Sequence, residues 1–173
     1  MYRVLFFAWL LAGAGLTGCN KPEVAAPAPP PPQEHKLPTH AQSKLQTMKI
    51  YLGPETLDAE LALTPIEEET GMMFRTNILD TDAMLFVLPY TQQASFWMMH
   101  CPESISCAYI DPDGVIQEIH HLEKNDTNVV LSAYPNIRFV LETSEGWFAR
   151  HHIGTNMVIT TEHGSLPAVF LRN

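Results

Sequence analysis

Short stretches of apolar residues, or of alternating apolar and polar residues, repeat along the chain from residue 48 onward. Each stretch is five to seven residues long and is separated from the next by turn-forming residues, as is typical of β-strands. The stretches lie at 48–52, 57–63, 83–88, 95–99, 105–110, 115–121, 137–143, 156–160 and 168–172. The pattern predicts about eight short strands.

Two segments between these strands carry helix signals. Thr64 precedes Pro65 and lies three residues before Glu67, which is the sequence of an N-cap, a proline in the first turn and a capping box. Ser144 can cap a second short helix, which Gly154 can end.

The sequence DPDG at residues 111–114 predicts a tight turn, because proline presets the backbone and glycine allows the chain to reverse. The stretches on either side, 105–110 and 115–121, are therefore expected to form a hairpin. About eight short strands with two short helices predict a mainly β (α+β) domain, folded as a partly open barrel or a sandwich with helices at its rim.

The N-terminal residues predict export and a lipid anchor. Residues 1–18 carry Arg3 and then an apolar run that is too short to cross a bilayer, which is typical of a secretory signal peptide. Residues 16–19, ending in Cys19, resemble the lipobox of bacterial lipoproteins. The resemblance implies lipid on Cys19 and attachment to a membrane. Asn20 is not the aspartate associated with inner-membrane retention, so we expect the outer membrane, facing the periplasm.

Composition separates a tether from a domain. Seven of the fourteen prolines lie between residues 20 and 38, so we expect residues 19–44 to form an extended linker and 45–173 to form one domain. The formal net charge is −9 and there is no basic run, which argues against nucleic acid as a partner.

Four motifs in the domain resemble the DUF192 family, also called UPF0127. They are GMMFR at 71–75, MLF at 84–86, FWM at 96–98, and LE at 141–142 followed by Gly146. The resemblance implies a compact, mainly β fold and frequent export, and it implies no established activity. The chain departs from the family after FWM, where the family's polar Asn and Asp are absent.

The stretch WMMHCPESISC at residues 97–107 contains two cysteines. If 95–100 and 105–110 paired as antiparallel strands, Cys101 and Cys107 would face each other at a distance that a disulfide accepts. Export leads to an oxidising compartment, and lipid on Cys19 would leave these two as an even pair. We therefore expect a disulfide between them.

Copper binding is an alternative for the same stretch, because thioether, imidazole and thiolate are soft ligands that select copper(I). Neighbouring residues on a strand point to opposite faces, so only Met98 with His100, or Met99 with Cys101, could share one ion. The corresponding function would be that of a periplasmic copper-binding protein. We otherwise expect no metal and no other cofactor.

A small hydrolase is a second alternative. Cys101 would act as the nucleophile, His100 or a remote histidine as the base, and Asp111 or Glu142 as the residue that orients it. No catalytic signature surrounds either cysteine, so we favour a protein without catalytic residues.

Five residues are candidate contacts for a small polar ligand: Arg75, Trp97, His100, Glu142 and Trp147. Either tryptophan could serve as a stacking platform in a shallow cleft. The structural alternative is that Arg75 pairs with a carboxylate and Trp147 packs a helix onto the sheet. The sequence thus predicts a lipid-anchored, non-catalytic module of the cell envelope that binds a small polar ligand or an envelope protein.

Overall fold

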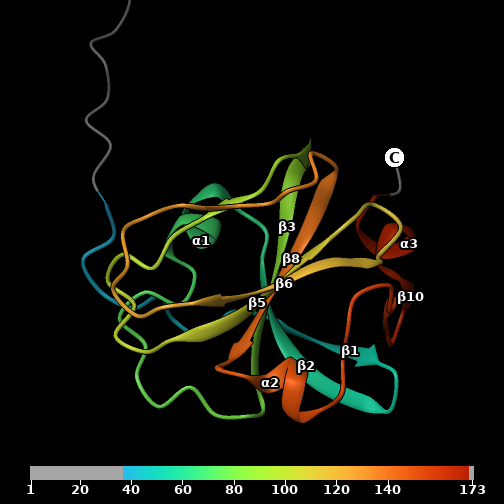
Figure 1. Cartoon of the computed structure of the whole chain (residues 1–173), viewed down its shortest axis with the longest axis horizontal. Helices are drawn as coiled ribbons and strands as arrows, with labels where there is room; N and C mark the ends of the chain where they lie inside the picture. Colours follow the sequence, from blue (N-terminus) through green and yellow to red (C-terminus); the bar gives the residue numbers. More distant parts are fainter. Residues whose placement is uncertain (1–36, 172–173) are drawn as a thin grey trace, which may run out of the picture. The chain divides into compact units, whose positions relative to one another are not determined.

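The computed structural model describes residues 37–171 (Figure 1). The predicted signal peptide, Cys19 and most of the predicted tether lie outside these residues. No helix within residues 37–171 is long and apolar enough to span a membrane.

Ten strands and three short helices lie in the described part of the chain, which confirms the mainly β prediction. They are β1 (Thr47–Leu52), β2 (Glu55–Ala62), α1 (Pro65–Thr70), β3 (Asp82–Gln92), β4 (Ser95–Phe96), β5 (Ile105–Ile110), β6 (Ile116–Leu122), β7 (Val130–Leu131), β8 (Ile137–Ser144), α2 (Trp147–Arg150), β9 (Ile159–Thr161), β10 (Gly164–Ser165) and α3 (Leu166–Phe170).

Eight of these strands form one mixed sheet in the order β10-β9-β1-β2-β3-β8-β5-β6, and β4 pairs with β7 in a separate two-stranded sheet. The large sheet is open rather than closed into a barrel. β2 and β3 run parallel, and the segment that connects them contains α1. The other neighbours in the large sheet are antiparallel, including the predicted hairpin of β5 and β6.

The predicted capping box begins α1 as expected. The Thr64 hydroxyl accepts a hydrogen bond from the Glu67 backbone N–H at 3.4 Å, and the Glu67 carboxylate accepts one from the Thr64 N–H at 2.9 Å. These reciprocal bonds satisfy N–H groups that the first turn of a helix leaves without partners. The start of α1 is therefore fixed, and with it the position of the acidic residues that follow.

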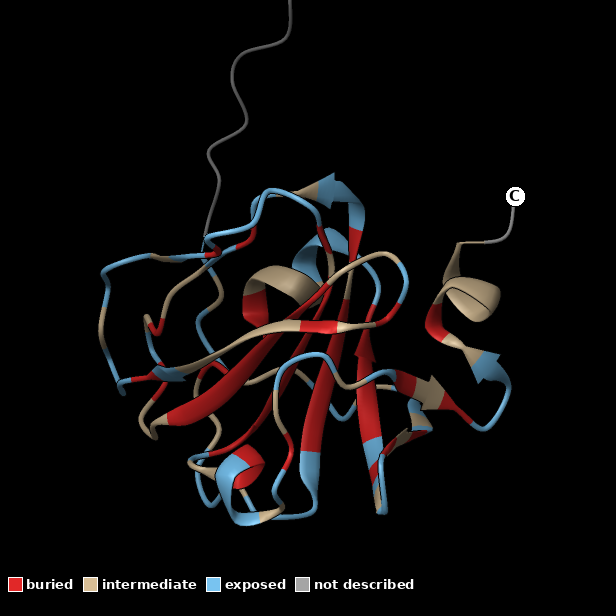
Figure 2. Cartoon of the chain, turned by 45° about the vertical axis from the view of Figure 1, so that its right-hand side comes forward, coloured by how far each residue is buried: buried red, intermediate tan, exposed pale blue. Residues whose placement is uncertain are grey.

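Two apolar clusters cover the two faces of the sheet. Figure 2 shows that buried residues are concentrated along the strands of the sheet. Successive residues of a strand point to opposite faces, so Leu141 of β8 belongs to the first cluster and Val140 to the second. The first cluster also includes side chains of α2 and α3. The second includes side chains from residues 72–73 and 94–101. The central strands are consequently buried on both faces.

The prediction of a strand at 168–172 is wrong for the described part of that segment, because residues 168–170 belong to α3 and Leu171 is its C-cap. Ser165 caps that helix by accepting a hydrogen bond from the Ala168 N–H at 3.4 Å, and Pro167 lies in the first turn. The same two signals identified α1 from the sequence. They were outweighed here by the apolar run that follows, which fits a strand as well as a buried helix.

The second predicted helix is present but shorter than expected. α2 begins after Gly146, whose φ of 70° is in the left-handed region, rather than after Ser144. Its C-cap is His151, so it ends before Gly154. The Ser144 hydroxyl instead donates a hydrogen bond to Asp80.

The predicted pairing of 95–100 with 105–110 is also wrong. β4 pairs with β7, while β5 is flanked by β6 and β8. Both hydrogen-bonding edges of β5 are occupied, so no further strand can join it. Residues 99–100 form a turn, in which His100 has a left-handed φ of 59°.

The expected disulfide is absent from the described residues, where Cys101 and Cys107 are free and buried thiols. Burial raises the pKa of Cys101 to about 12, and it raises the pKa of Cys107 as well. The reactive species in thiol alkylation is the thiolate, so both cysteines are protected chemically as well as sterically.

Alkylation with iodoacetamide tests this arrangement. The protein is extracted without reductant and digested with trypsin after alkylation. If it is denatured before alkylation, we expect the tryptic peptide 76–124 to carry two adducts. If it is alkylated while folded, we expect that peptide to carry none. Mass spectrometry of that peptide reads both results. A peptide that accepts adducts only after reduction would contain the disulfide and would contradict the structure.

Candidate functional site

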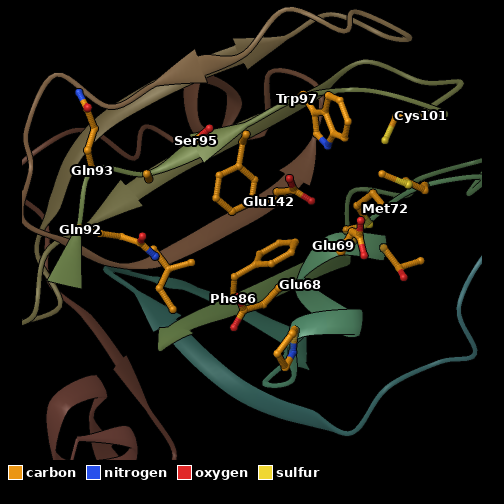
Figure 3. A pocket seen from close by; sticks show the side chains of 17 residues that line it. Glu68, Glu69, Met72, Phe86, Gln92, Gln93, Ser95, Trp97, Cys101 and Glu142 are labelled. Carbon is orange, nitrogen blue, oxygen red and sulfur yellow. The ribbon is translucent and has the colours of Figure 1, made fainter. Parts of the chain in front are cut away.

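A cavity of about 330 Å³ lies on the face of the sheet that carries the second apolar cluster (Figure 3). Its walls come from α1 and the residues that follow it, from β3, and from the segment between β3 and Cys101. The lining residues are Pro65, Glu68, Glu69, Thr70, Gly71, Met72, Met73, Phe86, Leu88, Gln92, Gln93, Ala94, Ser95, Phe96, Trp97, Cys101 and Glu142. Its size is at the lower end of the range for small-molecule sites, about 300–1,000 Å³.

Glu142 is the central polar residue of this cavity. It lies on β8, where it is paired with Met84 of β3 on one side and with Cys107 of β5 on the other. Directly paired residues point to the same face, so these two apolar neighbours flank a carboxyl group. Glu142 is only 4% exposed, and its Oε2 has no hydrogen-bond partner among the described residues.

Burial raises the pKa of Glu142 from 4.5 to about 8, although the positive charge of Arg75 opposes the shift. Arg75 does not form an ion pair with Glu142, because both ends of its guanidinium donate to Glu60, at 2.6 and 2.9 Å. Removing an ionised carboxylate from water is costly when no partner is supplied. Glu142 is therefore mainly protonated at neutral pH.

Aromatic side chains form much of the wall around this carboxyl group. Phe86 and Phe96 meet edge to face with 5.2 Å between ring centroids, and Phe96 also contacts Tyr109. Tyr109 is held in place because its hydroxyl donates to the Val130 carbonyl at 2.7 Å. Figure 3 shows Glu142 directed into the space between Trp97 and Phe86. The contacts among these rings indicate that the apolar wall is preformed.

The side of the cavity formed by α1 is acidic. Glu68 and Glu69 line it from the second half of that helix, and burial raises the pKa of Glu68. No lysine, arginine or histidine lies among the lining residues. The cavity therefore combines three carboxyl groups with three aromatic rings.

The structure brings together two of the five candidate ligand contacts, Trp97 and Glu142. Arg75 instead borders a separate shallow pocket beside its ion-pair partner Glu60. His100 is exposed and stacks on Phe74, with 4.9 Å between ring centroids.

Trp147 lies in the first cluster, which covers the opposite face of the sheet. It is 1% exposed and packs against Phe148 and His151 of α2 and its C-cap. This position matches the structural alternative, in which Trp147 holds a helix on the sheet.

Sequence reasoning missed several wall residues. Phe86 and Phe96 belong to the DUF192 motifs and were noted only as parts of a pattern. Glu68 lies in the short helix that the capping box predicts, and no sequence pattern marks it as part of a site. Their convergence depends on the parallel β2–α1–β3 connection, which no short-range pattern reveals.

The residues considered for copper are spread over different environments. Met98 is buried in the second cluster, Met99 is half-buried, and His100 is exposed. The Cys101 thiol lies at the cavity wall. Residues 37–171 contain no group of three or more His, Cys, Asp or Glu side chains placed to hold a metal ion.

A serine, an aspartate and a histidine do meet elsewhere, at the surface. Asp80 accepts hydrogen bonds from the Ser144 hydroxyl at 3.0 Å and from His151 Nε2 at 2.8 Å, and it pairs with Arg150. The side chains of Arg150 and His151 hold the pKa of Asp80 at about 2. The aspartate lies between the other two, so the histidine does not contact the serine as a catalytic base would. This cluster ties the segment before β3 to α2.

Replacing Glu142 by glutamine tests the buried acid. Above pH 4.5 the unfolded chain releases the Glu142 proton, whereas the folded wild type retains it up to about pH 8. The contribution of Glu142 to the free energy of unfolding is therefore full below pH 4.5 and falls as the pH rises towards about 8. The amide of E142Q keeps the shape of the protonated acid and does not titrate. We expect similar unfolding free energies near pH 5 and a variant more stable by roughly 1–3 kcal/mol at pH 8.

Chemical denaturation at the two pH values measures this difference. Glu145→Gln is the matched control, because the side chain of Glu145 is 61% exposed and three residues away. A difference between wild type and E142Q that does not change with pH would contradict an elevated pKa at Glu142.

Comparisons with known proteins agree with this fold. The sequence model of DUF192, described as "Uncharacterized ACR", matches residues 48–161. A protein from Sinorhizobium meliloti 1021, provisionally named a transcription regulator, is similar in structure with a TM-score of 0.65 and 23% identity, covering 70% of this chain and 98% of its own. A protein of unknown function from Novosphingobium aromaticivorans DSM 12444 has a TM-score of 0.64 and 27% identity, covering 69% and 89%.

No curated protein matches the chain. At 23% identity, the likeness to the Sinorhizobium protein concerns the fold alone. The sequence model of the family spans more than half of the chain, from the second residue of β1 to the end of β9. The chain therefore belongs to the DUF192 family.

Proposed function

We propose that this protein is a lipid-anchored, non-catalytic binding module of the bacterial cell envelope, which takes a small organic ligand into the cavity around Glu142. One observation carries the proposal: the Glu142 carboxyl group is 4% exposed at the wall of a cavity, and its Oε2 has no hydrogen-bond partner in the part of the chain that the structure describes. A buried polar atom without a partner costs free energy, typically about 1–3 kcal/mol. A ligand that hydrogen-bonds to Oε2 would recover that cost.

The form of the cavity also favours binding. Typical ligand sites are concave, mainly apolar, and contain a few polar groups that orient the ligand. Phe86, Phe96 and Trp97 supply the apolar surface, and Glu142 supplies the orienting group. Strongly perturbed carboxyl groups in clefts are enriched at functional sites.

Binding accounts for the cavity better than catalysis does. A nucleophile needs a base within hydrogen-bonding distance. In the described residues, neither the Cys101 thiol nor the Ser95 hydroxyl is hydrogen-bonded to Glu142. The Cys101 thiol is also protonated at neutral pH, because burial raises its pKa to about 12.

The anchor is supported by the lipobox-like residues 16–19 and by the proline-rich segment that follows. We propose that the lipid holds the protein at the outer membrane while the domain reaches ligands in the periplasm.

A thermal-shift screen of the full-length protein tests the binding function. The panel contains small amines, amino acids, carboxylates, sugars and alcohols. At a concentration of about 100 times its Kd, a ligand that binds only the folded state stabilises that state by about 2.7 kcal/mol. We therefore expect one chemical class in the panel to raise the Tm by several degrees. The shift should shrink in Trp97→Ala and Glu142→Gln and persist in Glu145→Gln.

Absence of any stabilising compound in the panel would overturn the binding function. So would a compound whose effect is the same in wild type and in both cavity variants, because it would act elsewhere on the protein.

Substitution of Cys19 tests the anchor separately. We expect Cys19→Ala to move the protein from the membrane fraction to a soluble form, because the thiol is the predicted attachment point of the lipid. Fractionation and intact mass of the recovered protein measure the change. An unmodified wild-type Cys19, or a variant that stays in the membrane fraction, would contradict the anchor.

A further inference from the structure

We infer that the ligand of the Glu142 cavity is a small organic ammonium ion, whose N–H group donates to Glu142 and whose apolar part lies against Phe86, Phe96 and Trp97. This inference rests on the proposed function and names the ligand class. It depends on three independent features of the cavity, which are its charge, the missing hydrogen-bond donor and the chemistry of its walls.

The charge of the cavity favours a cation. Glu68, Glu69 and Glu142 contribute three carboxyl groups to the lining, and no basic side chain lies there. Arg75, the cation that acts on Glu142, donates to Glu60 through both terminal nitrogens of its guanidinium, and Arg138 acts on Glu68 from outside the lining. An anionic ligand would meet repulsion from the carboxylates on α1.

The missing donor selects an ammonium over a metal ion or a quaternary amine. Within residues 37–171, Oε2 of Glu142 has no hydrogen-bond partner, and the N–H group of a ligand can supply one. A quaternary amine carries the charge without a donor. A metal ion requires several ligating atoms, and the described residues offer no group of three metal-ligating side chains. A primary ammonium provides both charge and donor.

The walls suit the rest of such a ligand. The faces of aromatic rings attract cations, most strongly when water is excluded. Phe86, Phe96 and Trp97 surround the carboxyl group, and Met72 and Met73 add flexible apolar surface on the side of α1. Methionine adapts readily to the shape of an aliphatic chain. The cavity walls can therefore contact both the ammonium group and the alkyl chain of one ligand.

Binding of a cation should release a proton. Glu142 holds a proton at neutral pH, and an ammonium favours the ionised carboxylate. The proton leaves the carboxyl oxygen for solvent as the ammonium N–H takes its place. The titratable or charged groups that line the cavity or act on Glu142 are Arg75, Glu68, Glu69, Cys101, Cys107 and Tyr109. The two thiols and the phenol stay neutral because their pKa values are raised.

NMR titration of the full-length protein with three matched probes tests the inference. The probes are n-butylammonium, 1-butanol and butyrate, which share an alkyl chain and differ in charge. We expect n-butylammonium to shift the Trp97 indole N–H signal and to bind at least tenfold more tightly at pH 8 than at pH 6. Neither 1-butanol nor butyrate should match its affinity at pH 8.

Variants assign the effect to the cavity. Glu142→Gln should abolish the pH dependence and weaken binding at pH 8 at least tenfold, while Glu145→Gln should preserve both. Glu142→Gln retains the shape of the protonated acid, so it is expected to fold. Glu68→Gln, at the margin of the cavity, should weaken binding by a smaller factor without changing the pH dependence.

The possible contrary results have different meanings. Equal or tighter binding of 1-butanol or butyrate, or affinity for n-butylammonium that falls as the pH rises, would overturn the ammonium inference and leave the binding function standing. The same holds if all three probes fail while another class in the thermal-shift panel binds. Failure of every compound in both experiments would overturn the proposed function as well.

Discussion

The placement of an unpaired carboxyl group in the middle of a sheet is the constraint on which the proposed site depends. β8 is hydrogen-bonded on both sides, to β3 and β5, so its register cannot slip without moving every side chain to the opposite face. This register directs Glu142 to the same face as Met84 and Cys107. The stability of the sheet thereby compensates for the cost of burying an acid.

The remaining elements give this acid its surroundings. The parallel pairing of β2 with β3 requires a crossover, and the capped helix α1 in that crossover brings Glu68 and Glu69 to the cavity. The register shift of β3 against β8 between Val87 and Gln92 accompanies the departure of the chain towards β4. The two-stranded sheet of β4 and β7 then supports the side chains of Phe96 and Trp97 beside Glu142.

Local signals predicted most elements but not their assembly. The capping box at Thr64, the turn at 111–114 and the strand at 105–110 depend on neighbouring residues, and each was correct. The pairing of 95–100 was wrong because strand partners are chosen by the whole sheet, and β5 already had two. The segment 168–172 was assigned to a strand because a short apolar run fits either element. Trp97 and Glu142 were selected from family motifs, and the cavity between them depends on tertiary packing.

The proposed site depends above all on the pKa of Glu142. A ¹³C NMR titration of protein labelled at the glutamate carboxyl carbons, with the resonance assigned by comparison with E142Q, would measure it in the ligand-free protein. A midpoint near pH 8 is expected, because the carboxyl group is buried and has no ion-pair partner among the described residues. A midpoint near 4.5 would mean that Glu142 is solvated or paired, and would contradict the buried acid from which the site was inferred.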